Sequence, residues 1–252
     1  MKDKIALVTG GSRGLGKNMA LSLAQGGSDV ILTYHSKEEE ALGVVKEIEG
    51  KGRRAATLQL DAGEMKSFDG FFERVSRILK ETWGRDTFDF LINNAGVGGN
   101  GSVAGTSEET FDLLSNIHFK GVFFLTQKAL PLIADNGRII NLSSGLARMT
   151  TPGYAAYASM KSAVETLTRY LAKEVGARGI TANVIAPGII RTDFTKDVYE
   201  NAPQIIEFIA SQTALGRTGV PEDIGGIVAF LCTEEARWIT AQRIEASGGQ
   251  FL

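Results

Sequence analysis

The stretch that decides the fold runs Ile5-Ala-Leu-Val-Thr-Gly-Gly-Ser-Arg-Gly-Leu-Gly16, a short apolar run that passes into a glycine-rich turn. The apolar run is typical of a strand that is buried on both faces of a sheet. Glycines at Gly10, Gly14 and Gly16 let the backbone turn tightly and approach a pyrophosphate, whose charge the N-terminus of the following helix stabilises. We therefore predict a strand–turn–helix unit that binds a dinucleotide. The spacing differs from G-x-G-x-x-G, so an ordinary glycine-rich turn is the alternative interpretation.

The rest of the chain repeats this alternation of short apolar runs with longer amphipathic stretches. The further apolar runs are Val30–Tyr34, Ala55–Leu60, Phe88–Ile92, Arg138–Leu142, Thr181–Ala186 and a weaker Gln242–Glu245. Helical patterns occupy 64–82, 107–130, 155–175 and 221–231, and Ser36 with Glu39 forms a capping box for one more helix. This order predicts an α/β fold, a doubly wound parallel sheet (Rossmann fold). We expect a single domain over residues 1–252, in which the segment 189–216 covers the site with one or two short helices.

Composition excludes several other classes of protein. The chain has 252 residues, a formal net charge of −2, 30 Gly, 2 His and one cysteine, Cys232. Because positive and negative charges nearly cancel, the composition argues against a nucleic-acid partner. With so few Cys and His residues, we expect no metal site. No apolar stretch approaches the ~18 residues of a membrane helix, and the first residues do not resemble a signal peptide. We therefore expect a cytoplasmic protein with no membrane partner.

The end of the second apolar run indicates which dinucleotide is bound. NAD-binding proteins of this class carry an acid about 20 residues past the glycine loop, where it binds the ribose 2′-hydroxyl. Here the run ends in Tyr34-His-Ser-Lys37, and the acids Glu38–Glu40 fit the first turn of the next helix. Arg13 and Lys37 can both reach a 2′-phosphate, which favours NADP over NAD. The alternative is that both cations are merely solvated.

A phenol and an ammonium group stand four residues apart at Tyr157 and Lys161. On a helix this spacing puts both side chains on one face. A neighbouring cation stabilises phenolate and lowers the pKa of the phenol, so such a tyrosine can give a proton to an alkoxide or take one from an alcohol. Ser144 ends the fifth apolar run at the carboxyl edge of the predicted sheet, where its hydroxyl can hold a substrate oxygen.

Together these motifs resemble the short-chain dehydrogenase/reductase superfamily, and more narrowly its bacterial 3-oxoacyl-carrier-protein-reductase-like members. The resemblance rests on Thr9-Gly10…Gly14-Leu15-Gly16, Asn93-Asn94-Ala95-Gly96, Ser144, Tyr157-x3-Lys161 and Pro187-Gly188. It implies an NADPH-dependent carbonyl reductase, reversible as an alcohol dehydrogenase, in which Ser144 orients the carbonyl and Tyr157 is the acid and base. It also implies a homotetramer, with a dimer as the alternative.

The resemblance assigns the cofactor contacts residue by residue. For the pyrophosphate and the 2′-phosphate it implies Thr9, Gly10, Ser12, Arg13, Leu15, Gly16, Ser36 and Lys37. For the adenine and its ribose it implies Asp61, Ala62, Asn94, Ala95 and Gly96, and for the nicotinamide end Tyr157, Lys161, Pro187, Gly188, Ile190 and Thr192, of which Ile190 and Thr192 would hold the carboxamide and the pyrophosphate. Asp61 also fits a plain turn or cap residue.

One residue departs from the family pattern. The family usually has a catalytic asparagine three residues before a glycine, and counting back from Gly121 reaches His118. An imidazole there could join a proton relay to Lys161 and add a group that titrates near neutral pH. Alternatively it only fills the space, and a water completes the relay. We expect His118→Asn to keep substantial activity and to change the pH profile, whereas an unchanged profile would count against the relay.

Three other functions compete with carbonyl reduction. Tyr154 and Lys161 have the Y-x6-K spacing of the enoyl reductases of the superfamily, which reduce a C=C bond, but Tyr157 favours C=O chemistry. A non-catalytic NADP-binding sensor would be expected to lack the Tyr/Lys pair. An epimerase or dehydratase acting on nucleotide sugars usually has a larger C-terminal region than the 60 residues after Thr192. The segment 191–216 mixes apolar residues with charges, which predicts a partly apolar small-molecule substrate, with an acyl thioester, a ketone and a quinone all open.

Overall fold

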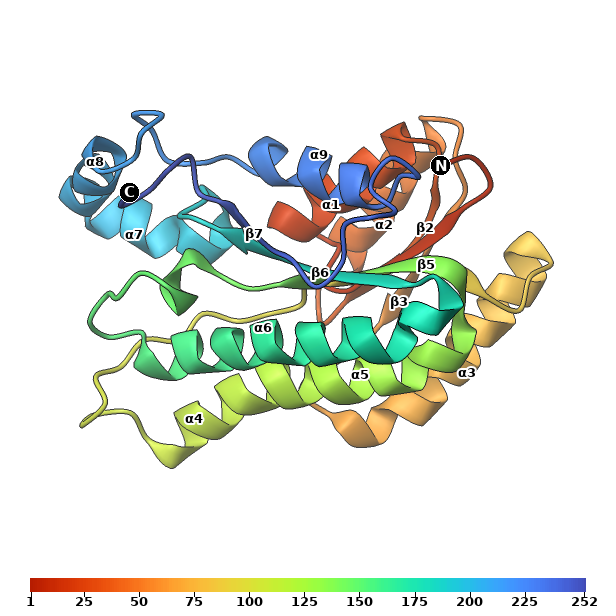
Figure 1. Cartoon of the computed structure of the whole chain (residues 1–252), viewed down its shortest axis with the longest axis horizontal. Helices are drawn as coiled ribbons and strands as arrows, with labels where there is room; N and C mark the ends of the chain where they lie inside the picture. Colours follow the sequence, from red (N-terminus) through yellow and green to blue (C-terminus); the bar gives the residue numbers. More distant parts are fainter.

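Seven parallel strands form one sheet in the computed structural model, which describes residues 1–252 (Figure 1). The spatial order is β3-β2-β1-β4-β5-β6-β7. The strands are β1 (Ile5–Val8), β2 (Asp29–Tyr34), β3 (Ala55–Gln59), β4 (Phe88–Asn93), β5 (Ile133–Leu142), β6 (Thr181–Pro187) and β7 (Arg243–Ala246). The predicted doubly wound sheet is confirmed, and each predicted apolar run overlaps one strand.

Helices cover both faces of the sheet, as the two-sided burial of its strands requires. On one face lie α1 (Gly14–Gln25), α2 (Glu38–Glu49) and α9 (Glu222–Leu231), and on the other α3 (Phe68–Ile78), α4 (Glu108–Ser115), α5 (Gly121–Ala129) and α6 (Ala155–Val175) (Figure 1). Alternate residues of β1 divide between two cores, Ala6 and Val8 in one and Ile5 and Leu7 in the other. No helix of the structure combines the length and the apolar character that a bilayer crossing requires.

The predicted capping box at Ser36 and Glu39 is wrong. Helix α2 begins at Glu38, and Lys37 occupies the N-cap position without a side-chain hydrogen bond to the first turn. Three acidic side chains, Glu38–Glu40, fill that turn instead. Their negative charge interacts favourably with the positive end of the helix dipole, so the helix start is stabilised without a capping hydroxyl.

The predicted helix 107–130 is interrupted in its middle. A π-helical turn, Asn116–Lys120, separates α4 from α5, and the insertion is followed directly by Gly121. A Cβ at Gly121 would lie 2.0 Å from the carbonyl oxygen of Ala62, so the helix passes this loop at a distance that only glycine allows. Single π turns inside helices often mark functional sites, and this one carries His118. The predicted helix 64–82 is likewise composite, because a 3₁₀ turn precedes α3 and a π turn follows it.

The segment 189–216 contains a 3₁₀ turn (Asp193–Thr195), α7 (Lys196–Asn201) and α8 (Pro203–Ser211), in agreement with the short helices predicted for it. The last residues of the chain run back beside α7 and α8 (Figure 1). Gly249 O accepts a hydrogen bond from Ala214 N, and Phe251 N donates one to Gln212 O. The chain end is therefore packed against the base of α8.

Candidate active site

The order of the sheet reverses between β1 and β4, which places a crevice at their carboxyl ends. Side chains lock these two strand ends together. Thr9 Oγ1 accepts hydrogen bonds from the backbone N–H groups of Asn94 (2.9 Å) and Ala95 (3.0 Å). Asn94 Nδ2 donates in return to the carbonyl oxygens of Thr9 (2.9 Å) and Gly10 (3.1 Å). Thr9, Asn94 and Ala95, which the sequence predicts to contact the cofactor, therefore lie together between β1 and β4, where the strand order reverses.

The glycine loop between β1 and α1 has the geometry of an anion cradle. Gly10 has φ of +64°, and a Cβ added at Gly16 would lie 2.0 Å from the carbonyl oxygen of Gly10. The first turn of α1 contains no acidic side chain, so nothing cancels the positive end of the helix dipole. Ser12, Arg13 and Leu15 lie in the same short loop and first turn. The loop therefore fits the pyrophosphate of a dinucleotide.

The two cations predicted for the 2′-phosphate are both exposed and weakly paired. Arg13 Nη1 lies 3.6 Å from Asp193, and Lys37 Nζ lies 3.9 Å from Glu40. Exposed pairs of this kind are worth about 0–1 kcal/mol, so a phosphate can compete for either cation. Ser36 is exposed beside Lys37.

The other predicted cofactor contacts lie in two places, in the turn after β3 and in the loop after β6. Asp61 Oδ1 accepts a hydrogen bond from Gly63 N (2.8 Å), so this carboxylate shapes a turn. Pro187 and Gly188 lie at the end of β6, and Thr192 lies against the glycine loop, 3.6 Å from a Cβ added at Gly14. The side chain of Ile190 is buried in the core, which leaves only its backbone for a contact with a carboxamide.

Tyr157 and Lys161 lie together at the start of α6, beside Ser144. Lys161 Nζ is 5.6 Å from the centre of the Tyr157 ring and donates a hydrogen bond to Leu142 O (2.8 Å). Burial lowers the pKa of Lys161 to about 8. Burial also raises the pKa of Tyr157 to about 12, and the Ser144 hydroxyl lowers it only in part. The lowered pKa that the sequence predicts for Tyr157 is therefore wrong, because the loss of hydration outweighs the Ser144 hydrogen bond, and Tyr157 holds its proton at neutral pH.

His118 lies in the same cluster, at the π turn between α4 and α5. Its ring packs edge-to-face on Tyr157, with 5.0 Å between ring centroids, and its Nε2 lies 2.8 Å from Val97 O. Burial and the neighbouring Lys161 charge lower the pKa of His118 to about 3. The prediction that His118 titrates near neutral pH is therefore wrong, because the buried imidazole stays neutral. A Cβ at Gly96 would lie 2.7 Å from the imidazole Cε1, which accounts for that glycine.

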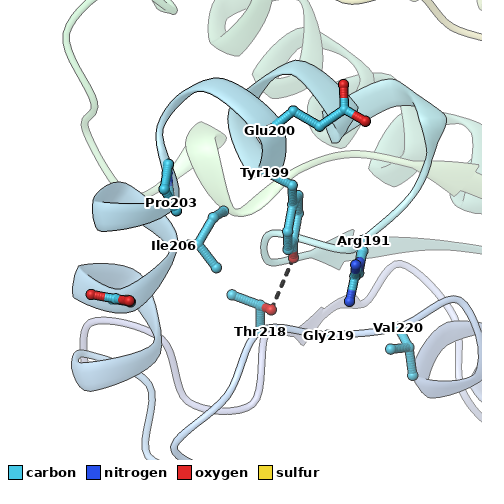
Figure 2. A pocket seen from close by; sticks show the side chains of 9 residues that line it. Arg191, Tyr199, Glu200, Pro203, Ile206, Thr218, Gly219 and Val220 are labelled. Carbon is cyan, nitrogen blue, oxygen red and sulfur yellow. Dashed lines mark hydrogen bonds between the residues drawn. The ribbon is translucent and has the colours of Figure 1, made fainter.

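The segment 189–216 faces two different spaces. Phe194 lies over Tyr157, with 6.4 Å between ring centroids, and its side chain is about half exposed. A cavity of about 440 Å³ lies apart from Tyr157. Figure 2 shows its lining, in which the Tyr199 hydroxyl bonds to Thr218 Oγ1, at 2.9 Å. Arg191, Tyr199 and Ile206 line this cavity, and none of the residues around Tyr157 does. Phe194 and the residues that line this cavity therefore face different spaces.

Sequence reasoning misses two features around this site. Gln250 Oε1 accepts a hydrogen bond from Ile189 N (3.3 Å), so the chain end supports the loop after β6. Glu165 accepts a hydrogen bond from Ser143 and pairs with Arg243. In both cases the partners lie more than 20 residues apart in the sequence, so no local motif predicts these contacts.

Comparison with known proteins supports the resemblance seen in the sequence. A family model described as Enoyl-(Acyl carrier protein) reductase matches residues 10–250. The 3-oxoacyl-[acyl-carrier-protein] reductase FabG of Staphylococcus aureus (strain Mu50 / ATCC 700699) is 36% identical over 252 residues, which cover 99% of this chain and 98% of that protein.

Two solved structures are also similar over almost the whole chain. The promiscuous reductase LugOII, which catalyses keto-reduction at C1 during lugdunomycin biosynthesis, shares 38% identity at a TM-score of 0.93, over 100% of this chain and 99% of that chain. The angucycline C-6 ketoreductase LanV with bound NADP shares 37% identity at a TM-score of 0.94, over 99% of this chain and 96% of that chain. This chain therefore belongs to the short-chain dehydrogenase/reductase superfamily and resembles its 3-oxoacyl-carrier-protein-reductase-like members.

Proposed function

We propose that this protein is an NADPH-dependent oxidoreductase that reduces a ketone or 3-oxoacyl carbonyl to an alcohol. The observation that carries the proposal is the cluster of Ser144, Tyr157 and Lys161 at the carboxyl edge of the sheet, on the same edge as the glycine loop and two strands away from it. FabG, LugOII and LanV, to which the chain is similar along its length, are all named as reductases of C=O groups.

The residues of the site divide the proton chemistry between them. The Ser144 hydroxyl donates a hydrogen bond to the substrate carbonyl oxygen and so fixes its position. Tyr157 keeps its proton at neutral pH and gives it to that oxygen as negative charge develops there. The Lys161 ammonium, 5.6 Å from the ring centre, stabilises the phenolate that remains. NADPH, when bound, supplies the hydride that reduces the carbonyl carbon.

The chain offers NADPH a cradle and two cations. The glycine loop would hold the pyrophosphate, and Arg13 and Lys37 would hold the 2′-phosphate, since no carboxylate stands at the end of β2. Asp61, Ala62, Asn94, Ala95 and Gly96 would flank the adenosine. The nicotinamide end would be held by Tyr157, Lys161, Pro187, Gly188, Ile190 and Thr192.

Enoyl reduction, the activity in the description of the family model, is the second candidate. It would use Tyr154, which stands at the N-cap of α6, one residue before the helix. Tyr157 rather than Tyr154 packs on His118 and lies beside Lys161. This arrangement favours carbonyl reduction over C=C reduction.

A substrate panel tests the proposal directly. NADPH oxidation would be followed with ketones, 3-oxoacyl thioesters, quinones and enoyl thioesters, and each assay repeated with NADH. We expect turnover of at least one carbonyl class and a clear preference for NADPH. Reduction of enoyl thioesters alone would overturn the proposed reaction, and equal rates with NADH would remove the role of Arg13 and Lys37.

We propose further that the protein assembles as a homotetramer in the cytoplasm. Large apolar side chains are exposed on two opposite sides of the molecule, Phe123, Phe124 and Tyr170 on α5 and α6, and Phe230 and Trp238 on and after α9. Two different self-complementary faces are what a tetramer with three two-fold axes needs. A cytoplasmic location fits the single cysteine, which is buried.

Light scattering after size-exclusion chromatography tests this assembly. We expect a tetramer for the unmodified chain and a dimer for Phe124→Glu, because a charge on one face leaves the other interface intact. If the unmodified chain is a dimer, only one of the two proposed interfaces forms. If it is a monomer, the proposed assembly is overturned.

A further inference from the structure

Three successive residues at the end of β5 are each held by a long charged side chain from another element. Lys161 of α6 donates to Leu142 O (2.8 Å). The Ser143 hydroxyl donates to Glu165 Oε1 (2.6 Å), also on α6. Arg243 Nη2 of β7 donates to Ser144 O (3.4 Å). The strand end that carries the proposed catalytic serine is therefore anchored residue by residue.

Arg243 connects these anchors into one network. Its Nε donates to the same Glu165 oxygen that Ser143 contacts (2.7 Å), and its Nη1 donates to Glu245 (2.8 Å). Glu245 also accepts hydrogen bonds from Ser247 (3.0 Å) and from Arg148 (3.3 Å), in the loop that follows Ser144. A planar guanidinium donates in three fixed directions at once, which a lysine cannot do.

The three charged side chains at the centre of the network are largely shielded from solvent. The side chains of Arg243, Glu165 and Glu245 are 22%, 14% and 17% exposed. Pairs this enclosed are screened by salt much less than surface pairs, and each holds its partner in a defined position. Burial disfavours the charged form of Arg243, but the hydrogen bonds and charges of Glu245 and Glu165 outweigh it and raise the pKa, so Arg243 stays protonated.

We infer that Arg243 and Glu165 are positioning residues that fix Ser144 for the reaction. The inference rests on the proposed function, because it gives Ser144 the task of orienting the carbonyl. Arg243 contacts Ser144 directly and contacts Ser143 through Glu165, so its loss frees two adjacent residues of the strand end. A displacement of about 1 Å in a catalytic group can cost about a hundredfold in rate.

A double-mutant cycle between Arg243 and Ser144 tests this role. We expect Arg243→Gln to lower kcat by about tenfold and to leave the KM for NADPH within about twofold, because the glycine loop is untouched. In a Ser144→Ala background the same change should have no further effect, since the residue through which Arg243 acts is already gone. Arg243→Lys, which keeps the charge without the three-way fork, should recover only part of kcat.

Arg178 supplies the matched control at the other end of the same strand. It pairs with Asp135 (2.8 Å) and donates to the carbonyl oxygens of Leu130 and Ile133. Arg178→Gln should therefore disturb the amino end of β5 and leave kcat unchanged. Equal losses in Arg178→Gln and Arg243→Gln, or multiplicative losses in the Arg243/Ser144 pair, would reduce Arg243 to a general structural role and overturn the inference.

Amide hydrogen exchange separates this inference from the proposed function. We expect faster exchange in peptides that cover 143–149 in Arg243→Gln, and unchanged exchange there in Arg178→Gln. This readout needs no substrate, so it stands even if the unmodified protein reduces no carbonyl in the panel. Unchanged exchange at 143–149 in Arg243→Gln would overturn the positioning role, whether or not the protein reduces a carbonyl.

Discussion

At the scale of single residues, the chemistry depends on which groups keep their protons. Enclosure makes Tyr157 a weaker acid, with a pKa of about 12, and makes Lys161 a weaker base, with a pKa of about 8. His118 is driven to the neutral form. A neutral phenol beside a cation is prepared to donate a proton, which is the direction that carbonyl reduction requires.

Replacing Tyr157 by Phe removes the proton donor without changing the shape of the ring. We expect kcat to fall by about 10²–10⁴-fold, the range for loss of a general acid, while NADPH still binds. Steady-state NADPH oxidation and a binding titration measure the two effects. Tyr154→Phe is the control and should keep most of the activity, whereas the reverse pattern would assign the chemistry to Tyr154 and enoyl reduction.

His118→Asn tests whether the imidazole is held neutral. Its pKa is about 3 in the folded protein, against about 6.5 in an unfolded chain, so between these values the unfolded state binds more protons. Stability must then fall as the pH drops through this window, by up to about 1.4 kcal/mol per pH unit. The asparagine variant lacks this loss, so urea unfolding should show the unmodified protein weakening more between about pH 6.5 and 5.

The same substitution revises the expectation for activity. Because a neutral imidazole does not titrate near pH 7, we now expect the pH profile of kcat to keep its shape in His118→Asn. Parallel loss of stability in both proteins on acidification would show that His118 is not held neutral. A shifted kcat profile would restore a relay role for it.

At the scale of elements, the sequence predicts well those features that depend on residues close together in the chain. Continuous apolar runs mark the seven strands, and the glycine loop, Ser144, Tyr157 and Lys161 stand at strand ends or on a helix where a short motif identifies them. The π turn at Asn116–Lys120 is different, because no residue in it marks the break, and the Gly121 that follows it is required by the carbonyl of Ala62, about 60 residues earlier in the chain. The Arg243 network and the packing of the chain end also join distant segments. Such features depend on tertiary packing, which no local pattern encodes.

Glycines inside helices give an element-scale prediction. Gly43 lies within α2, and an added Cβ would meet nothing within 4 Å. Gly43→Ala should therefore stabilise the protein by about 0.5–1 kcal/mol, since alanine is the better helix former. Urea unfolding measures the change. Gly121→Ala is the contrast, because its Cβ would overlap the Ala62 carbonyl, and a gain in stability there would contradict the observed close approach.

At the scale of the whole molecule, the single thiol reports on the integrity of the fold. Cys232 is 3% exposed in the core between the sheet and the layer of α1, α2 and α9, and burial raises its pKa to about 12. Thiolate is the reactive form, so the folded protein should not react with an aromatic disulfide reagent at mildly alkaline pH. Labelling should begin only when the fold opens, at a rate that NADPH lowers because it binds the folded state.

The control for this measurement is Cys232→Ala, which should give no signal in urea. Rapid stoichiometric labelling of the folded protein would mean that the core around Cys232 opens independently of global unfolding. An NADPH-insensitive rate would mean that the opening at Cys232 leaves the cofactor site intact.

For the gene that encodes this chain, the close approach of Gly16 to Gly10 has a genetic consequence. Any missense change in that codon adds a Cβ that would lie 2.0 Å from a carbonyl oxygen, so the codon has no neutral amino-acid replacement. The codons for Gly43 and Gly70 encode helical glycines with open space around them, and replacement of these residues is expected to be tolerated. In a library of random variants selected for activity, Gly16 should therefore stay invariant while these helical glycines diversify.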